Sequence, residues 1–283
     1  MSFSTRRILV HGGLLALTLV TTTVAGAIWS GAESIVSFEG LARGLPFSLS
    51  LLAILLCHEL GHYLMCVRYG IDASWPYFLP APPILIPWGT FGAFIRVRSG
   101  FQDRRALFDM GAAGPWAGFV VSVVVLIVGL RLSHVDPTPP TGTMLFFGDS
   151  LLTGWLTRVI VGAEPDQVFI HPVGIAGWFG LLVTSLNLLP AGQLDGGHVL
   201  YAAVGRRTPI VSGLMAVALV WLAIRLWPGW LLWAGVMVLM TRLGHPSTAD
   251  DHVPIGAGRL VAAVASLILL AITFVPEPIR ILP

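Results

Sequence analysis

The residues with the clearest chemical potential form the run His58-Glu59-Leu60-Gly61-His62. Four positions separate the two histidines, so a helix places both imidazoles on one face, about one turn apart. Two nitrogen ligands in this arrangement can hold one Zn²⁺ ion, and Glu59 beside them can take a proton from water at the metal. The spacing therefore indicates a hydrolytic zinc site.

The surroundings of this run strengthen that interpretation. It lies within an apolar stretch, residues 46–67, in which Glu59 is the single acidic residue. A charged side chain at the centre of a membrane helix costs at least ~2.5 kcal/mol on insertion scales. A glutamate retained there beside two histidines at metal spacing indicates catalysis. The alternative interpretation is a buried polar cluster that only joins helices.

A catalytic zinc ion needs a third protein ligand and an open position for water. Asp195 is the candidate, because Pro190 and Gly192 interrupt the apolar stretch before it. Gly196 and Gly197 directly after it permit close backbone approach. A carboxylate at such a broken helix can lie at the same depth as the histidine pair. The alternative is that Asp195 only caps the following helix, a position that aspartate favours.

The composition indicates whether the chain is surrounded by water or by lipid. The chain has 283 residues, of which 55% are hydrophobic and 11% are charged, whereas soluble domains carry about 25% charged residues. The mean hydropathy of +0.84 agrees. The net charge of +2, carried by scattered arginines with no lysine, is too small to suggest a nucleic-acid partner. These values predict a protein whose partner is the lipid bilayer.

Spans of about 20 apolar residues cross a bilayer as helices. We predict an all-α polytopic membrane protein with six to seven transmembrane helices, forming a single membrane domain over residues 1–283. The predicted spans are 8–28, 46–67, 107–130, 170–189, 210–226, 230–240 and 260–274, with a shorter helix at 197–204.

The first span has two interpretations. It can be a retained helix, or Arg6, Arg7 and the small residues at 25–27 can mark a cleaved signal peptide. With the N-terminus in the cytosol, eleven of the sixteen arginines fall on the inner side and five on the outer side. The excess of inner arginines favours this orientation.

Two connections differ from ordinary loops. Residues 69–106 begin with a segment rich in proline and aromatic residues and continue into the apolar, β-like segment 91–97. Irregular backbone at membrane depth survives only where protein or a water-filled cavity shelters it, so we predict a re-entrant strand or hairpin here. The connection 133–168 is polar and is predicted to be a loose outer loop. Neither can contain an inserted peptide-binding domain of about 100 residues.

Other histidines and the two cysteines make weaker candidates. His171 is predicted to be structural, and Cys57 and Cys66 are predicted to be packing residues. His198 could orient the metal site, although a simple contact on a helix face is the preferred interpretation. A final group could bind a second metal, although a solvated loop is the preferred interpretation: His245, Asp250, Asp251 and His252.

The paired motifs resemble those of the site-2 protease family of intramembrane zinc metalloproteases. The first is the run from His58 to His62, and the second is Asn187…Pro190…Leu194-Asp195-Gly196. Phe91-Gly92-Ala93-Phe94-Ile95 and Gly111-Ala112-Ala113-Gly114-Pro115 resemble further segments of the family. The likeness covers roughly residues 46–205, which we take as the catalytic core, and leaves 206–283 as accessory helices.

The resemblance implies a role for each matching position. His58, His62 and Asp195 would be ligands of one Zn²⁺, with Glu59 as the general base. Asn187 would contact the substrate or the developing oxyanion, and a further segment would pair with an extended substrate: Phe91, Gly92, Ala93, Phe94 and Ile95. The protein would be a compact member without a PDZ insertion.

The resemblance also implies partners and a location. The substrates would be membrane-anchored, single-span proteins, cleaved near the cytoplasmic side of what we expect to be a prokaryotic cytoplasmic membrane. Two rivals remain. One is a prenyl-protein protease type, which needs a downstream glutamate that this chain first offers at Glu164. The other is a divalent-metal transporter or metal-dependent scaffold without hydrolytic activity.

Overall fold

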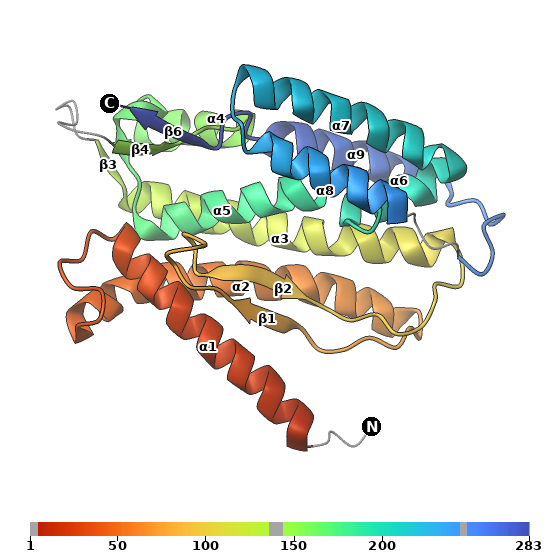
Figure 1. Ribbon diagram of the computed structural model, residues 1–283, viewed down its shortest axis with the longest axis horizontal. Coiled ribbons are helices and arrows are strands. Elements are labelled where there is room, and N and C mark those ends of the chain that lie inside the picture. The colour runs from red at the N-terminus through yellow and green to blue at the C-terminus, as the bar shows by residue number, and fades with distance from the viewer. Residues whose placement is uncertain (1–4, 136–143, 244–247, 283) are drawn as a thin grey trace. The chain divides into compact units, whose positions relative to one another are not determined.

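The computed structural model describes residues 5–135, 144–243 and 248–282, and helices dominate them (Figure 1). The α-helices are α1 (Thr5–Trp29), α2 (Phe38–Arg68), α3 (Arg104–Leu132), α4 (Leu151–Val161), α5 (Pro172–Asn187), α6 (Asp195–Val204), α7 (Thr208–Arg225), α8 (Trp230–Leu243) and α9 (Ala257–Thr273). Two 3₁₀ turns are η1 (Pro165–Gln167) and η2 (Gly205–Arg207). The strands form three two-stranded sheets: β1 (Tyr77–Pro80) with β2 (Thr90–Phe94), β3 (His134–Val135) with β5 (Val168–Phe169), and β4 (Met144–Phe147) with β6 (Ile279–Leu282).

The chain gathers into two compact units. The first contains Met1–Ser99, Ala117–His134 and Phe169–Leu181, and the second contains Gly100–Trp116, Val135–Val168 and Leu182–Pro283. Each has its own buried apolar core, with Phe47, Leu51 and Leu126 in the first and Leu219 and Trp230 in the second.

In the first unit, α1 packs closely against α2 through small residues. A Cβ atom on Gly26 would lie 2.3 Å from the carbonyl oxygen of Gly44, and one on Gly44 would lie 2.1 Å from that of Thr23. The hydroxyls of Thr22 and Ser48 also hydrogen-bond across the two helices. Small residues and interhelical hydroxyls are the usual means of helix association in lipid. Whether α1 is retained or cleaved as a signal peptide stays a prediction.

The helix that carries the histidine pair is longer than we predicted. It begins at Phe38, eight residues before the predicted start at residue 46, and Pro46 lies inside it. The Ser37 side chain accepts a hydrogen bond of 3.0 Å from the Gly40 amide and so caps the first turn. Proline removes one backbone hydrogen bond from a helix, but helices in membranes tolerate this when neighbouring groups compensate.

The predicted strand after α2 is one arm of an antiparallel hairpin, β1–β2. Tyr77 pairs with Phe94 and Leu79 with Gly92, and the register shifts between Leu79 and Pro80. The hairpin continues beyond the named strands, because Ser74 donates its amide to the Arg96 carbonyl. The β-like prediction for this segment is confirmed, whereas its re-entrant position in a membrane stays a prediction.

The prediction of a loose loop at 133–168 is wrong for the described part of that segment. Residues 151–161 form α4, which starts with a capping box between Ser150 and Thr153 and ends at Gly162 with a φ of 75°. The strand before it, β4, pairs antiparallel with the distant β6. We read this segment as polar loop because its helix is short and its strand partner lies more than 130 residues away. Residues 136–143 of this connection lie outside the described residues.

In the second unit, the acidic residues near position 250 anchor the loop before α9. Asp251 accepts hydrogen bonds from the hydroxyls of Tyr201 (2.6 Å) and Thr248 (2.7 Å), and Arg104 Nε lies 3.8 Å from it. Burial opposes ionisation of Asp251, but these hydrogen bonds and Arg104 hold its pKa below its usual value. Asp250 accepts from the His252 amide. The carboxylates we considered for a second metal are thus engaged in loop contacts, and His245 lies outside the described residues.

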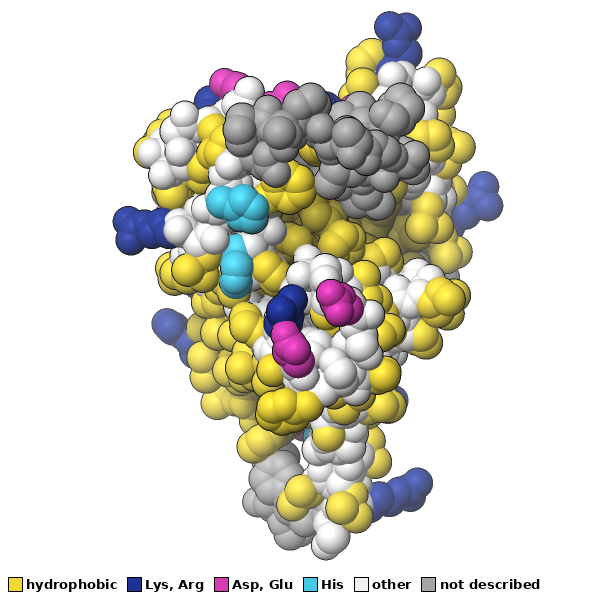
Figure 2. All heavy atoms as spheres, turned by 90° about the vertical axis from the view of Figure 1, so that its left-hand side faces the viewer, with side chains coloured by type: hydrophobic (Ala, Val, Ile, Leu, Met, Phe, Trp, Pro, Cys, Tyr) yellow, Lys and Arg dark blue, Asp and Glu magenta, His cyan; other side chains and the backbone are white. Residues whose placement is uncertain are grey.

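Four stretches are long and apolar enough to cross a membrane: Thr5–Trp29, Phe38–Arg68, Arg104–Leu132 and Asp195–Arg225. The apolar helices α4, α5, α8 and α9 are shorter, and α5 has 16 residues where we predicted a span of 20. Figure 2 shows a face covered largely by hydrophobic side chains, with few and scattered charges. The exposed apolar side chains agree with a membrane location, since Leu9, Leu214 and Val261 are about 70% exposed. These features indicate an integral membrane protein. The number of crossings, six or seven, stays a prediction.

Candidate metal centre

The two histidines of the first motif lie on α2 and turn their rings toward each other. His58 Nε2 and His62 Nε2 are 3.1 Å apart, and the ring planes meet at 71°. Both side chains are buried, at 5% exposure. Two nitrogens that share a tetrahedral zinc ion at ~2.05 Å lie about 3.4 Å from each other. The pair therefore already has close to the separation that a shared ion requires.

Asp195 lies where the sequence predicts a break in the helix. Helix α5 ends at Asn187, a turn follows, and α6 begins at Asp195 itself. Gly192 in the turn has a φ of 43°, and a Cβ on Gly196 would lie 2.0 Å from the Leu188 carbonyl oxygen. Side chains larger than glycine are therefore excluded at this tight turn. The N-cap residue of α6 is Leu194, so Asp195 does not occupy the cap position that we considered as the alternative.

The donor atoms fit a zinc ion. His58, His62 and Asp195 each offer one ligand atom, and these atoms lie within 4.8 Å of one another. Two imidazoles and one carboxylate form a donor set that catalytic zinc sites use, with the fourth position left for water.

Glu59 and Asn187 differ in how far the structure supports their assigned roles. Glu59 is 6% exposed and follows His58 directly on α2. Asn187 is the last residue of α5 and is half-buried. Both side chains have interaction partners. The burial of Glu59 suits a base that must be shielded from bulk water, while the role of Asn187 stays a prediction.

The predicted substrate strand, residues 91–95, overlaps β2 (Thr90–Phe94) at residues 91–94. Thr90 at its start is 1% exposed, whereas Phe91 and Phe94 are 63% and 44% exposed. Gly92 has a φ of 101°, and its amide donates to the Thr90 hydroxyl at 3.0 Å. Among the described residues, β2 pairs with β1 alone, so no other strand occupies its second edge there.

The glycine-rich segment of α3 packs closely, and one of its glycines contacts a histidine of the pair directly. A Cβ on Gly118 would lie 3.0 Å from His58 Nδ1 and 3.2 Å from His58 Cβ. In the second unit, a Cβ on Gly111 would lie 2.7 Å from His198 Cβ. The contact of Gly118 with a predicted metal ligand was missed, because the sequence does not show which helix faces His58.

We expect Gly118→Ala to weaken zinc binding by roughly 10-fold or more, since changes in the shell behind a metal ligand typically cost 10–100-fold in affinity. The added methyl group forces the His58 ring to shift by a few tenths of an ångström. Competition with a fluorescent zinc chelator measures the affinity. Gly12→Ala is the matched control, because it is also helical and a Cβ there meets nothing within 4 Å. Unchanged affinity in Gly118→Ala would contradict this packing.

The remaining candidates have structural contacts. His171 Nδ1 accepts from the Val173 amide at the start of α5, and His198 lies 6.3 Å from the Phe101 ring. Cys66 is buried and Cys57 half-buried, both as free thiols. These contacts agree with the structural roles predicted for the histidines and the packing roles predicted for the cysteines.

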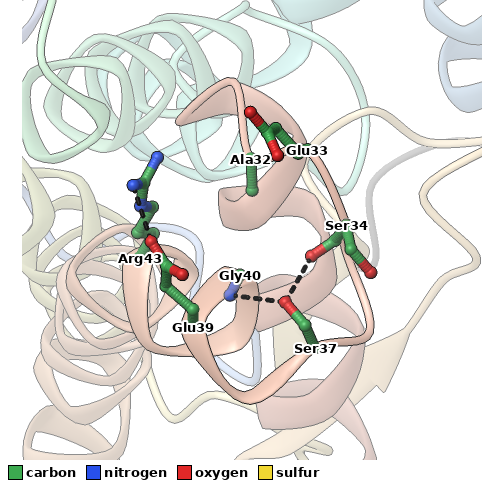
Figure 3. A pocket seen from close by; sticks show the side chains of 7 residues that line it. All are labelled: Ala32, Glu33, Ser34, Ser37, Glu39, Gly40 and Arg43. Atoms are coloured by element: carbon green, nitrogen blue, oxygen red, sulfur yellow. Dashed lines mark hydrogen bonds and ion pairs between the residues drawn. The ribbon is translucent and has the colours of Figure 1, made fainter.

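A polar pocket lies between the end of α1 and the start of α2 (Figure 3). It is lined by Ala32, Glu33, Ser34, Ser37, Glu39, Gly40 and Arg43. Arg43 pairs with Glu39 at 2.8 Å one helical turn away, and the Ser37 hydroxyl donates to the Ser34 carbonyl while capping α2. These are the contacts of a helix start, and we assign no chemistry to them.

Comparisons with known proteins agree with the paired motifs. The sequence model described as "Peptidase family M50" matches residues 46–226. The chain is 36% identical over 239 residues to an Arabidopsis thaliana protein named "Probable zinc metalloprotease EGY1, chloroplastic", which covers 82% of this chain and 43% of that protein. It is 30% identical over 249 residues to "Probable zinc metalloprotease EGY2, chloroplastic" of the same plant, covering 84% and 44%. The chain thus spans less than half the length of these relatives. Their chloroplast location does not support our expectation of a prokaryotic cytoplasmic membrane.

Proposed function

The chain belongs to peptidase family M50, the site-2 protease family, and we propose on this premise that it is a zinc metalloprotease that hydrolyses peptide bonds of membrane-anchored proteins. The observation that carries the proposal is the buried pair of imidazole nitrogens 3.1 Å apart on an apolar helix, with Glu59 directly beside it. A structural polar cluster has no need of two histidines in this geometry. The matched family segment, 46–226, contains the catalytic core that we place at residues 46–205.

In this proposal His58, His62 and Asp195 hold one Zn²⁺ per chain. When bound, the ion polarises the scissile carbonyl and lowers the pKa of a water ligand toward neutrality. The two histidines bind through Nε2, since these are the atoms that face each other. Asp195 supplies the negative charge that offsets part of the charge of the ion in an apolar surrounding.

Glu59 moves the protons. Its carboxylate accepts one from the attacking water and later gives it to the nitrogen of the leaving amine, so that acid and base are the same group. Its burial keeps bulk water away from this proton transfer. We assign to Asn187 the stabilisation of the oxyanion that develops on the scissile carbonyl, by donation from its side-chain amide.

The open edge of the β1–β2 hairpin is the proposed receptor for the substrate backbone. A transmembrane helix hides its carbonyls in its own hydrogen bonds, so the substrate must unwind and then be held extended, as in strand addition. Ala73 and Val97 form a bridge flanked by bonds from Ser74 to Arg96 and from Arg98 to Asp72. The backbone groups of Val97 therefore point away from the hairpin partner.

We propose that the amide of Ala93, in the middle of β2, points outward as the backbone groups of Val97 do. We expect Ala93→Pro, which removes one outward amide, to lower kcat/KM for a helical substrate by about 3- to 10-fold, the equivalent of one hydrogen bond of ~0.5–1.5 kcal/mol. Zinc content should not change. Cleavage assays with zinc analysis measure both values.

Ala93→Ser is the matched control, because it keeps the amide and should cleave at the rate of the unmodified protein. Normal turnover of a helical substrate by Ala93→Pro would refute the strand-pairing step while leaving the zinc chemistry untouched.

The proposed substrates are single-span membrane proteins cut near the cytosolic side. The arginine distribution supports this orientation, with eleven of sixteen on the side that would be cytosolic.

The experiment that tests the function places the full chain in liposomes with a single-span peptide substrate. We expect cleavage that a zinc chelator stops and added Zn²⁺ restores, with no flux of Zn²⁺ across the bilayer. Zinc flux without cleavage of any anchored peptide would instead support the divalent-metal transporter.

A further inference from the structure

We propose that His11 is a positioning residue, which fixes the β1–β2 hairpin against α1 and so keeps the substrate-receiving strand in place. The inference deepens the proposed function and rests on it, because the strand matters only if it receives substrate. It concerns the first unit alone, where α1 runs beside the hairpin (Figure 1).

The first contact is a hydrogen bond from His11 to the hairpin. His11 Nδ1 lies 3.1 Å from the carbonyl oxygen of Pro76, the residue before β1. A carbonyl oxygen only accepts hydrogen bonds, so Nδ1 must carry the proton and donate. The His11 side chain is half-buried on the otherwise exposed first turns of α1.

The second contact links His11 to both strands of the hairpin. The His11 ring stacks on Tyr77 of β1, with ring centroids 4.1 Å apart and planes at 28°. Tyr77 stacks in turn on Phe94 of β2, at 5.4 Å and 23°, and these two residues are partners in the strand register. One aromatic stack therefore links α1, β1 and β2.

Two further hydrogen bonds from α1 hold the turn of the hairpin. The Thr21 hydroxyl donates to the Gly89 carbonyl at 2.7 Å, and Trp29 Nε1 donates to the Pro87 carbonyl at 2.9 Å. Gly89 has a φ of 78°, and a Cβ on it would lie 2.5 Å from the Thr21 carbonyl oxygen. The hairpin is thus fixed to α1 at its turn and, through His11, at the opposite end.

This support matters because a two-stranded hairpin is at best marginally stable on its own. An edge that is ordered before the substrate arrives avoids the ordering cost that would otherwise weaken binding. Among the ring contacts and side-chain hydrogen bonds described above, the one at His11 continues to β2 through Tyr77. Loss of His11 should therefore weaken substrate binding more than the chemical step.

The kinetic test compares His11→Ala with two variants that each keep half of the contact. His11→Asn retains a donor and His11→Phe retains a stacking ring. We expect His11→Ala to raise KM for a helical single-span substrate about 5- to 10-fold with kcat within twofold and zinc content unchanged, as expected when binding rather than chemistry is lost. Both partial variants should fall between His11→Ala and the unmodified protein. Leu15→Ala, at an exposed position one turn along α1, is the control and should change neither constant.

A second measurement does not depend on activity. Hydrogen exchange of the amides at residues 90–97 should accelerate in His11→Ala and stay unchanged in Leu15→Ala. Tyr77→Ala should produce the same acceleration, and the double variant should add little to either, since both remove one stack. Unchanged exchange together with an unchanged KM would overturn the role of His11. If exchange accelerates in a protein that cleaves no substrate, the contact of His11 with the hairpin is supported. That result contradicts only the proposed protease function.

Discussion

Glu59→Gln is expected to lower kcat by about 10²- to 10⁴-fold, the usual contribution of a general acid–base group, while zinc stays bound. The amide keeps the shape of the carboxylate and can still accept a hydrogen bond, but it cannot take a proton from water or return it to the amine. At 6% exposure, bulk solvent has little access to substitute for it. Cleavage of a membrane-anchored peptide and metal analysis of the same preparation measure the two outcomes.

Glu39→Gln provides the control for this variant. Glu39 lies on the same helix, but its side chain is 77% exposed in a surface pair with Arg43, and such pairs contribute little to stability. Its replacement should leave both cleavage and zinc content unchanged. Full activity in a Glu59→Gln preparation free of unmodified protein would rule out Glu59 as the base and with it the proposed mechanism.

The sequence could predict the helix that carries the histidines because two independent features agree there. The apolar residues around His58 and His62 mark a membrane helix, and the interval of four places both rings on one face. The start of that helix was harder to predict. We placed the beginning at Pro46, where the apolar run begins, but Ser37 caps the helix nine residues earlier.

Elements that depend on distant partners were less predictable. The strand β4 becomes visible only through its pairing with β6, and a segment with no local strand signal reads as loop. The same limit applies to Gly118, whose role depends on the helix it faces. For Asp251 the sequence favoured a solvated loop over a second metal site, but it could not show the distant loop partners Tyr201 and Arg104.

The edge of the hairpin was only partly predictable from the sequence. The prolines predicted that the first part of residues 69–106 is not helical, and the apolar, β-like character of residues 91–97 predicted a strand. The sequence alone could not show which backbone groups of that strand point outward, because this follows from the bridge between Ala73 and Val97. It could not show the anchor at His11 either, since a lone histidine in an apolar helix gives no indication of its partner.

Removing any one of the three ligands is expected to lower zinc affinity by about 10²- to 10³-fold, if the ~10–16 kcal/mol of a four-ligand zinc site is divided among its ligands. His58→Ala and Asp195→Asn should therefore lose both zinc and hydrolysis at ordinary metal concentrations. Chelator competition measures the affinity, and circular dichroism of the detergent-solubilised protein shows whether the helices persist. His252→Ala, in an exposed loop, should bind zinc normally.

The combination of these two variants tests whether imidazole and carboxylate serve the same ion. If they do, the ligands act as a unit, and once one is lost the second replacement removes little more activity. The double variant His58→Ala/Asp195→Asn should then be about as inactive as either single variant. If Asp195 instead acts only at the start of α6, Asp195→Asn should keep its zinc, and its effect should multiply with that of His58→Ala. That result would separate the carboxylate from the metal and leave the histidine pair without a third ligand.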